Sequence, residues 1–223
     1  MNDSIRLGSL FDPQSELSIR EHVRPHWSQA GAIVFITFRT ADSIPQEVLR
    51  RWEREKQGWL QRHGCSPDRY WSEVLPTLDP ALQFEFKKTF QRSREKFLDR
   101  CQGECVLRKP ELAQIIAQTL LHFDGQRYRM GDFIVMPNHV HLLAVFASQD
   151  ALTAQCDSWL HYSARQINLA LGRKGKFWQQ EPFDHLVRST EQYDYLRTYI
   201  RDNGTHAGLP KSDYYYHRYL RQE

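Results

Sequence analysis

The chain has 223 residues, of which 40% are hydrophobic and 26% are charged, and its formal net charge is +3. This composition fits a globular domain with a sizeable core, and the slight positive charge permits a nucleic-acid partner without arguing for one. No run of about 18 apolar residues is present, which excludes a membrane-spanning helix, and the N-terminus lacks the pattern of a signal peptide. The four scattered cysteines are expected to be free thiols in a reducing cytoplasm.

The first half of the chain predicts a strand followed by a long helical segment. Residues 1–25 are expected to form an irregular leader over the domain surface. Residues 31–39 are β-branched and aromatic on both faces, which predicts a strand in the middle of a covered sheet. Residues 42–108 are predicted to be a helical insertion, with one helix that opens near Pro45 and another over 82–98. Acidic residues interrupt the basic ones of the later helix, so a solvated face is the default and a DNA-binding face the alternative.

The second half predicts a hairpin between helices. A helix that begins at Pro110 precedes two apolar runs, 127–136 and the run from His139, which a Pro-Asn pair joins as two strands. Further elements follow in order: a helix over 157–171, an irregular strand region over 177–188 and a helix over about 190–203.

This order predicts an α+β fold for the single domain 1–223. The arrangement is a ferredoxin-like βαββαβ antiparallel sheet with a helical insertion and an extra C-terminal helix. Residues 205–223 form a tyrosine-rich, basic tail. We expect this tail to pack over the sheet or to act as a mobile lid, and the alternative is base stacking.

Two histidines stand two residues apart where the second strand of the hairpin begins. Side chains alternate along a strand, so His139 and His141 share a face and lie roughly 7 Å apart along it. This spacing lets two imidazoles converge on one metal ion, while Val140 turns into a core. The alternative is that one or both are ordinary sheet histidines with hydrogen-bonding neighbours.

The helix over 190–203 supplies a second set of polar groups. At 100° per residue, Tyr193, Leu196 and Ile200 share one side and are expected to face the core. Tyr199 and Asn203 are four residues apart beside that face, so they lie one turn from each other. Docked beside the histidines, they could present a nucleophile and a third metal ligand. The alternative for Tyr199 is a half-buried packing aromatic.

The motif Val135-Met136-Pro137-Asn138-His139-Val140-His141-Leu142-Leu143 resembles the signature of the REP-associated tyrosine transposases, which are single-tyrosine HUH enzymes of the IS200-like type. The resemblance covers about residues 25 to 210. Further similar segments, in the same order and spacing, are Tyr128-Arg129-Met130, Gln166-Ile167-Asn168, residues 175–184, Val187-Arg188-Ser189, residues 199–203 and Ala207-Gly208-Leu209.

The resemblance implies a chemistry and assigns residues to it. The metal-binding histidines fall on His139 and His141, the nucleophilic tyrosine on Tyr199 and the third, polar ligand on Asn203. The implied reaction is cleavage of single-stranded hairpin DNA through a 5′-phosphotyrosine, with strand transfer as its reversal. A phenol of pKa near 10 is a weak nucleophile at neutral pH, so a divalent ion is expected to assist. The family implies Mg²⁺ or Mn²⁺, and imidazole ligands also suit zinc.

One position departs from the family pattern. The family has proline after the asparagine, and this chain has Gly204, a residue that also ends helices well. A DNA-binding protein derived from a transposase, with weak or no catalysis, is therefore an alternative function. A second alternative is a metal phosphodiesterase that uses water, with Tyr199 in a packing role.

DNA recognition is predicted for a few basic residues. The candidates are Arg173, Lys174 and Lys176 in a short glycine-rich loop, together with Arg129, and each is alternatively a plain surface charge. The expected partner is single-stranded or hairpin DNA, and no membrane association is expected. The expected localisation is cytoplasmic and nucleoid-associated. The protein is expected to be a monomer or a homodimer, whose site could be completed by a partner's helix.

Overall fold

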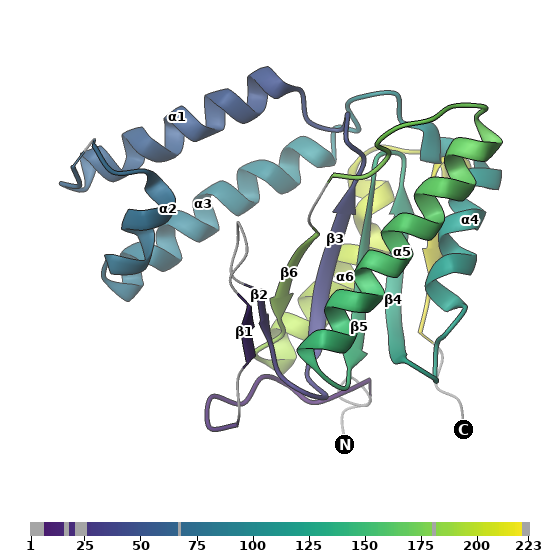
Figure 1. The fold of residues 1–223 in the computed structure, drawn as a ribbon, viewed down its shortest axis with the longest axis horizontal. Helices are drawn as coiled ribbons and strands as arrows, with labels where there is room; N and C mark the ends of the chain where they lie inside the picture. The colour runs from purple at the N-terminus through teal and green to yellow at the C-terminus, as the bar shows by residue number, and fades with distance from the viewer. Residues whose placement is uncertain (1–6, 16–17, 21–25, 67, 180–181, 220–223) are drawn as a thin grey trace. The chain divides into compact units, whose positions relative to one another are not determined.

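The computed structural model describes residues 7–219 apart from 16–17, 21–25, 67 and 180–181 (Figure 1). The chain divides into two units by its contacts, one formed by Met1–Ala41 with Glu104–Glu223 and the other by Asp42–Gly103. Among the described residues, no helix is long and apolar enough to cross a membrane.

The first unit is built on a five-stranded antiparallel sheet with the strand order β6-β3-β5-β4-β7. The strands are β3 (Ile33–Arg39), β4 (Tyr128–Met136), β5 (His139–Phe146), β6 (Phe183–Leu186) and β7 (Tyr215–His217). Apart from the edge strand β7, this is the strand arrangement of a βαββαβ ferredoxin-like unit. The predicted α+β fold class is therefore confirmed, including the hairpin that joins β4 to β5.

Helices cover both faces of this sheet. Figure 1 shows α4 (Pro110–Leu121) and α5 (Gln149–Ala170) in front of it, and α6 (Thr190–His206) behind it. The front face carries the larger apolar core, because alternate strand residues such as Val34, Leu142 and Phe133 meet apolar side chains of the two helices. The rear face contacts α6, the predicted extra C-terminal helix, through β4 and β5.

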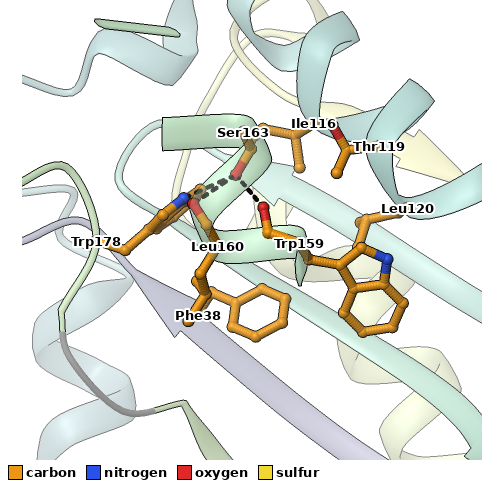
Figure 2. Close-up of a pocket in the computed structure, with 8 residues that line it drawn as sticks. All are labelled: Phe38, Ile116, Thr119, Leu120, Trp159, Leu160, Ser163 and Trp178. Atoms are coloured by element: carbon orange, nitrogen blue, oxygen red, sulfur yellow. Dashed lines mark hydrogen bonds between the residues drawn. The ribbon is translucent and has the colours of Figure 1, made fainter. Parts of the chain in front are cut away.

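The core between the sheet, α4 and α5 is almost completely filled. A void of about 10 Å³ lies between the three elements (Figure 2), and a space of that size holds a single water at most. Two hydroxyl side chains, Thr119 and Ser163, are among the residues that line it, and Ser163 bridges two tryptophans. Its hydroxyl donates to the carbonyl oxygen of Trp159 over 2.6 Å and accepts from the indole N–H of Trp178 over 2.9 Å. This region is therefore structural core, and a ligand site has to lie elsewhere.

The second unit is helical and has a small core of its own. Its helices are α1 (Gln46–Arg62), α2 (Trp71–Val74), the 3₁₀ turn η2 (Leu75–Thr77) and α3 (Pro80–Leu98). Trp59, Leu60, Val74 and Phe86 form its buried centre. The helix α3 begins where Asp79 accepts a hydrogen bond from the backbone N–H of Ala81, which is a side-chain cap ahead of a proline in the first turn.

Several element bounds differ from the prediction. Within the expected irregular leader 1–25, Ser18–Arg20 form the strand β1, which pairs with β2 (His26–Ser28) directly after the leader. Residues 1–6, 16–17 and 21–25 of the leader lie outside the described part. The helix predicted over 157–171 begins at Gln149, since Ser148 caps it by accepting from Ala151 N–H.

The predicted tail over 205–223 also differs. Its first residues extend α6 to His206, and it then contains the 3₁₀ turn η4 (Lys211–Asp213) and the strand β7. This strand pairs with the outer edge of β4, because an open edge offers unpaired backbone groups that a short extended segment can satisfy. Residues 220–223 of the tail lie outside the described part.

Candidate functional site

Both histidines of the sequence motif lie on β5, on the face of the sheet that α6 covers. They stand opposite β3 in the antiparallel register, with His141 across from Thr37 and His139 across from Arg39. Both side chains are almost completely buried, and their rings meet edge to face with centroids 4.6 Å apart. The strand therefore holds two imidazoles side by side in a protected position, as the alternation of side chains predicts.

Hydrogen bonds fix the orientation of each ring. Nδ1 of His139 lies 2.7 Å from Oδ1 of Asn138, and Nδ1 of His141 lies 2.8 Å from the hydroxyl of Thr37. An amide oxygen only accepts, so Nδ1 of His139 carries the proton and Nε2 carries the lone pair. A threonine hydroxyl can accept in the same way. Such partners on the remote nitrogen are how proteins orient metal-binding histidines.

Tyr199 reaches the histidines from α6. Ser189 caps the N-terminus of this helix, because its hydroxyl accepts from the backbone N–H of Gln192 over 3.2 Å. The apolar side of α6 is buried at the three positions predicted to face the core, Tyr193, Leu196 and Ile200. The half-buried Tyr199 places its hydroxyl 3.3 Å from Nε2 of His141. A phenol and an imidazole thus meet between two elements far apart in the chain.

Asn203 follows Tyr199 by one helical turn and is completely buried. The helix continues past it because Gly204, in place of the proline of the resembled family, keeps its backbone N–H and does not break the turn. A Cβ at Gly204 would lie 2.3 to 2.5 Å from three ring carbons of Tyr214. The glycine therefore makes room for the ring of Tyr214 beside the turn that carries Asn203.

The donor set suits a divalent cation. A ligating nitrogen of His139 and one of His141 lie within 4.8 Å of each other, and two metal–nitrogen bonds of about 2.1 Å span at most about 4.2 Å. The two nitrogens therefore lie close to the separation that one ion bridges. Two oriented imidazoles are neutral donors that leave the charge of an ion available to a phosphate, and the assignment of Asn203 as the third ligand stays a prediction.

Aromatic side chains surround the histidine–tyrosine pair. The ring of Phe35, on β3, stacks on His141 with centroids 5.3 Å apart, and it lies 6.4 Å from the ring of Tyr199. On its other side it meets His185 of β6 at 5.1 Å. Burial lowers the pKa of His185 from 6.5 to about 4. His185 is therefore a neutral imidazole at physiological pH, in the same aromatic surroundings as the site.

The predicted basic residues fall at opposite ends of the sheet. The loop with Lys174 and Lys176, both exposed, leads into Phe177, whose carbonyl oxygen accepts from the backbone N–H of Ala41 just after β3 ends. This is the end of the sheet that carries His139. In the same loop, Arg173 forms an ion pair of 2.5 Å with Glu104. By contrast, Arg129 pairs in register with Val145, roughly 13 Å along β5 from His141.

The sequence pattern missed several neighbours of the histidines. Thr37 and the buried Arg39 stand opposite them on β3, which the chain reaches about a hundred residues earlier. Only the pairing of the two strands reveals these contacts, and no local sequence motif predicts that pairing. Asn138 had a signal, because it lies inside the motif, but its role as a hydrogen-bond partner of His139 did not follow from the turn pattern.

A larger cavity lies on the other flank of α6. It has a volume of about 470 Å³ and is lined by Asp132, Asp194, Arg197, Thr198, Arg201, Tyr216 and Arg218. The buried Asp132 forms a 2.5 Å ion pair with Arg197 and accepts from the backbone N–H of Tyr219. The carboxylate of Asp132 therefore helps to attach the C-terminal segment to β4. The residues that line this cavity do not include His139 or His141.

No protein-family model and no curated protein matches this chain. A solved structure that it resembles is a REP-associated tyrosine transposase bound to a REP hairpin, at 14% sequence identity and a TM-score of 0.45. The alignment covers 86% of this chain and 77% of that one. That protein bears the name of the family which the histidine motif resembles, but a likeness this distant carries no argument about function.

Proposed function

We propose that this protein is a metal-dependent endonuclease and strand transferase for single-stranded or hairpin DNA, with Tyr199 as its nucleophile. The observation that carries the proposal is the approach of the Tyr199 hydroxyl to Nε2 of His141 at 3.3 Å. It joins the motif and the helix that the sequence had singled out separately. The resemblance of the motif to the tyrosine transposases supplies the substrate class.

The proposed reaction is a transesterification in two reversible halves. The oxygen of Tyr199 attacks the phosphorus of a phosphodiester and forms a bond to it, while the bond between phosphorus and the 3′ oxygen breaks. The phosphorus stays on the 5′ oxygen, so the product is a 5′-phosphotyrosine. The phenol proton leaves to solvent, and the released 3′ oxygen takes up a proton. Attack of a 3′-hydroxyl on the phosphotyrosine reverses these changes and transfers the strand.

The residues around Tyr199 have separate parts in this reaction. His139, His141 and Asn203 would hold Mg²⁺ or Mn²⁺. When bound, such an ion polarises the phosphate and orients it for attack. Thr37 and Asn138 keep the two imidazole rings in place through Nδ1. Burial of both histidines limits the water that competes with the tyrosine oxygen for phosphorus.

The decisive experiment is a test for the covalent adduct. Labelled single-stranded DNA with a hairpin from repeats near the gene is incubated with the protein and Mg²⁺ or Mn²⁺, and the products are separated on a denaturing protein gel. We expect a slow-migrating labelled band that is lost in Tyr199→Phe and in His139→Ala. The matched control is Tyr162→Phe, which removes an exposed phenol from α5 on the opposite face of the sheet and retains the band.

Other outcomes point to the alternatives. Tight DNA binding without a band, equal in the parent and in Tyr199→Phe, indicates a binding protein without this chemistry. Cleavage that survives Tyr199→Phe and leaves no adduct indicates attack by water and removes Tyr199 from the reaction.

A further inference from the structure

Tyr195 is a large aromatic residue that the folded chain leaves in solvent. Its side chain is 65% exposed, although Tyr193 and Leu196 beside it in α6 are buried. Its phenol is not needed for the chemistry proposed above. Its position is nevertheless specific, because it lies one turn before Tyr199 on the flank of the helix next to the histidines.

The ring of Tyr195 is aligned with the ring of the proposed nucleophile. The two planes differ by 11°, with centroids 6.3 Å apart. The hydroxyl of Tyr199 lies at His141, so a phosphodiester under attack there has its neighbouring sugars and bases at the mouth of the site. An exposed aromatic face at that place suits a nucleobase, because every base offers a flat π-face for stacking.

We infer that Tyr195 is a substrate-positioning residue that stacks on the base next to the scissile phosphate, an inference that rests on the proposed function. The ring spacing indicates which face it uses. A base between two rings needs two stacking intervals of about 3.4 Å, or roughly 6.8 Å in all. The planes of Tyr195 and Tyr199 are separated by 6.3 Å at most, so the base stacks on the outer, exposed face of Tyr195.

The charges near Tyr195 indicate a contact that does not depend on phosphate. Glu191 lies one turn before it on α6, and Asp202 further along the helix is held in an ion pair by Arg201. Among the described residues of α6, this flank carries no excess of positive charge to attract a phosphate backbone. Stacking therefore contributes affinity without releasing counterions, and its contribution changes little with salt concentration.

The test measures equilibrium binding of a fluorescent single-stranded oligonucleotide to the full chain by anisotropy. Tyr195→Ala is expected to weaken binding about 5- to 150-fold, the range found when one stacking aromatic is removed. Tyr195→Phe keeps the ring and should bind within about twofold of the parent. The matched control is Tyr162→Ala, which removes a 55% exposed tyrosine from α5 on the opposite face of the sheet and should change nothing.

Two further measurements separate stacking from a general disturbance. With an oligonucleotide of the same length whose sugars carry no bases, Tyr195→Ala and the parent should bind equally. Between about 50 and 200 mM salt, the two proteins should show the same slope of log affinity against log salt, with a constant offset. A changed slope, or a loss of affinity that persists on the abasic strand, overturns the inference.

The failures of the two proposals are distinguishable. If Tyr195→Ala binds the normal oligonucleotide as well as the parent does, and the parent still forms the Tyr199 adduct, the stacking inference is wrong and the proposed function stands. If the parent binds no single-stranded DNA at all, both are overturned.

Discussion

The two faces of the five-stranded sheet are built from the same strands and differ in what they bury. Towards α4 and α5, residues such as Val140 and Leu142 form a continuous apolar core. Towards α6, the same strands bury polar groups at the end where β5 begins, among them Thr37, His139 and His141. Further along that face the buried strand residues become apolar again, at Ile33 of β3 and its partner Val145 of β5.

The difference shows where the chain departs from what folding alone favours. A buried polar group costs free energy unless it is hydrogen bonded, and apolar residues of similar size would fill the same space at lower cost. The chain instead keeps a small polar cluster within one otherwise apolar face and orients it by hydrogen bonds such as the one between Thr37 and His141. Departures of this kind are expected at functional sites.

Substitution at two successive positions of β5 tests the comparison most strongly. Leu142→Ala leaves a hole in the core under α4 and α5 and should lower the free energy of unfolding by about 3 to 4 kcal/mol. His141→Leu, on the other face, should cost much less stability and abolish the DNA adduct. Urea denaturation and the adduct assay give the two values. Equal losses of stability at both positions would contradict the division of roles between the faces.

His185 gives a pH test of the rear face. Its folded pKa of about 4 lies below the ordinary 6.5, so the unfolded chain binds the extra proton between these values. Stability from the neutral imidazole is full above pH 6.5 and is lost as the pH falls towards 4, by about 3 kcal/mol in total.

The matched variant for this test is His185→Leu, which removes the titrating group from the ring contacts with Phe35. The free energy of unfolding of each protein is measured from pH 7 down to pH 4. Near neutrality the difference between the two values should hardly change with pH. The parent should then lose stability faster on the acid side. Parallel curves over the whole range would show that this histidine is not desolvated.

The sequence predicted those parts that local pattern determines. The 3.6-residue period placed Tyr193, Leu196 and Ile200 in the core, and the two-residue period placed His139 and His141 on one face. The order of strands and helices, together with the Pro-Asn turn, led to the ferredoxin-like sheet that the structure contains. The assignment of Tyr199 and Asn203 as nucleophile and ligand stays a prediction, although the helix does bring Tyr199 to His141.

The parts that were missed depend on contacts between distant segments. Strand β7 is three residues long and exists because the edge of β4 accepts it, so its own sequence carries little signal. The end of α6 was placed at Asn203 since glycine often terminates helices, whereas Gly204 here serves the close approach of Tyr214. Partners such as Thr37 require the register between β3 and β5, which no single segment encodes.

Gly204→Ala tests that close approach. The added Cβ would lie 2.3 Å from the nearest ring carbon of Tyr214, so the ring has to move, and we expect a loss of about 2 kcal/mol in unfolding free energy. In a Tyr214→Ala background the same substitution should be stabilising by about 0.5 to 1 kcal/mol, because alanine favours a helix over glycine. Thermal and urea denaturation of the four proteins complete the cycle. A loss of equal size in both backgrounds would mean that Tyr214 is not the obstacle.

Thr37→Val probes the smallest of these effects, the orientation of one ring. Valine has nearly the shape of threonine and removes the hydroxyl that lies 2.8 Å from Nδ1 of His141. The imidazole then loses the partner that holds it, so Mn²⁺ should bind about tenfold more weakly, which corresponds to about 1.4 kcal/mol. Titration calorimetry with Mn²⁺ gives the affinity, and Thr37→Ser, which restores a hydroxyl, should recover most of it. An unchanged affinity in the valine variant would mean that the hydroxyl of Thr37 does not orient His141, and that packing contacts such as the stacking of Phe35 on its ring are sufficient.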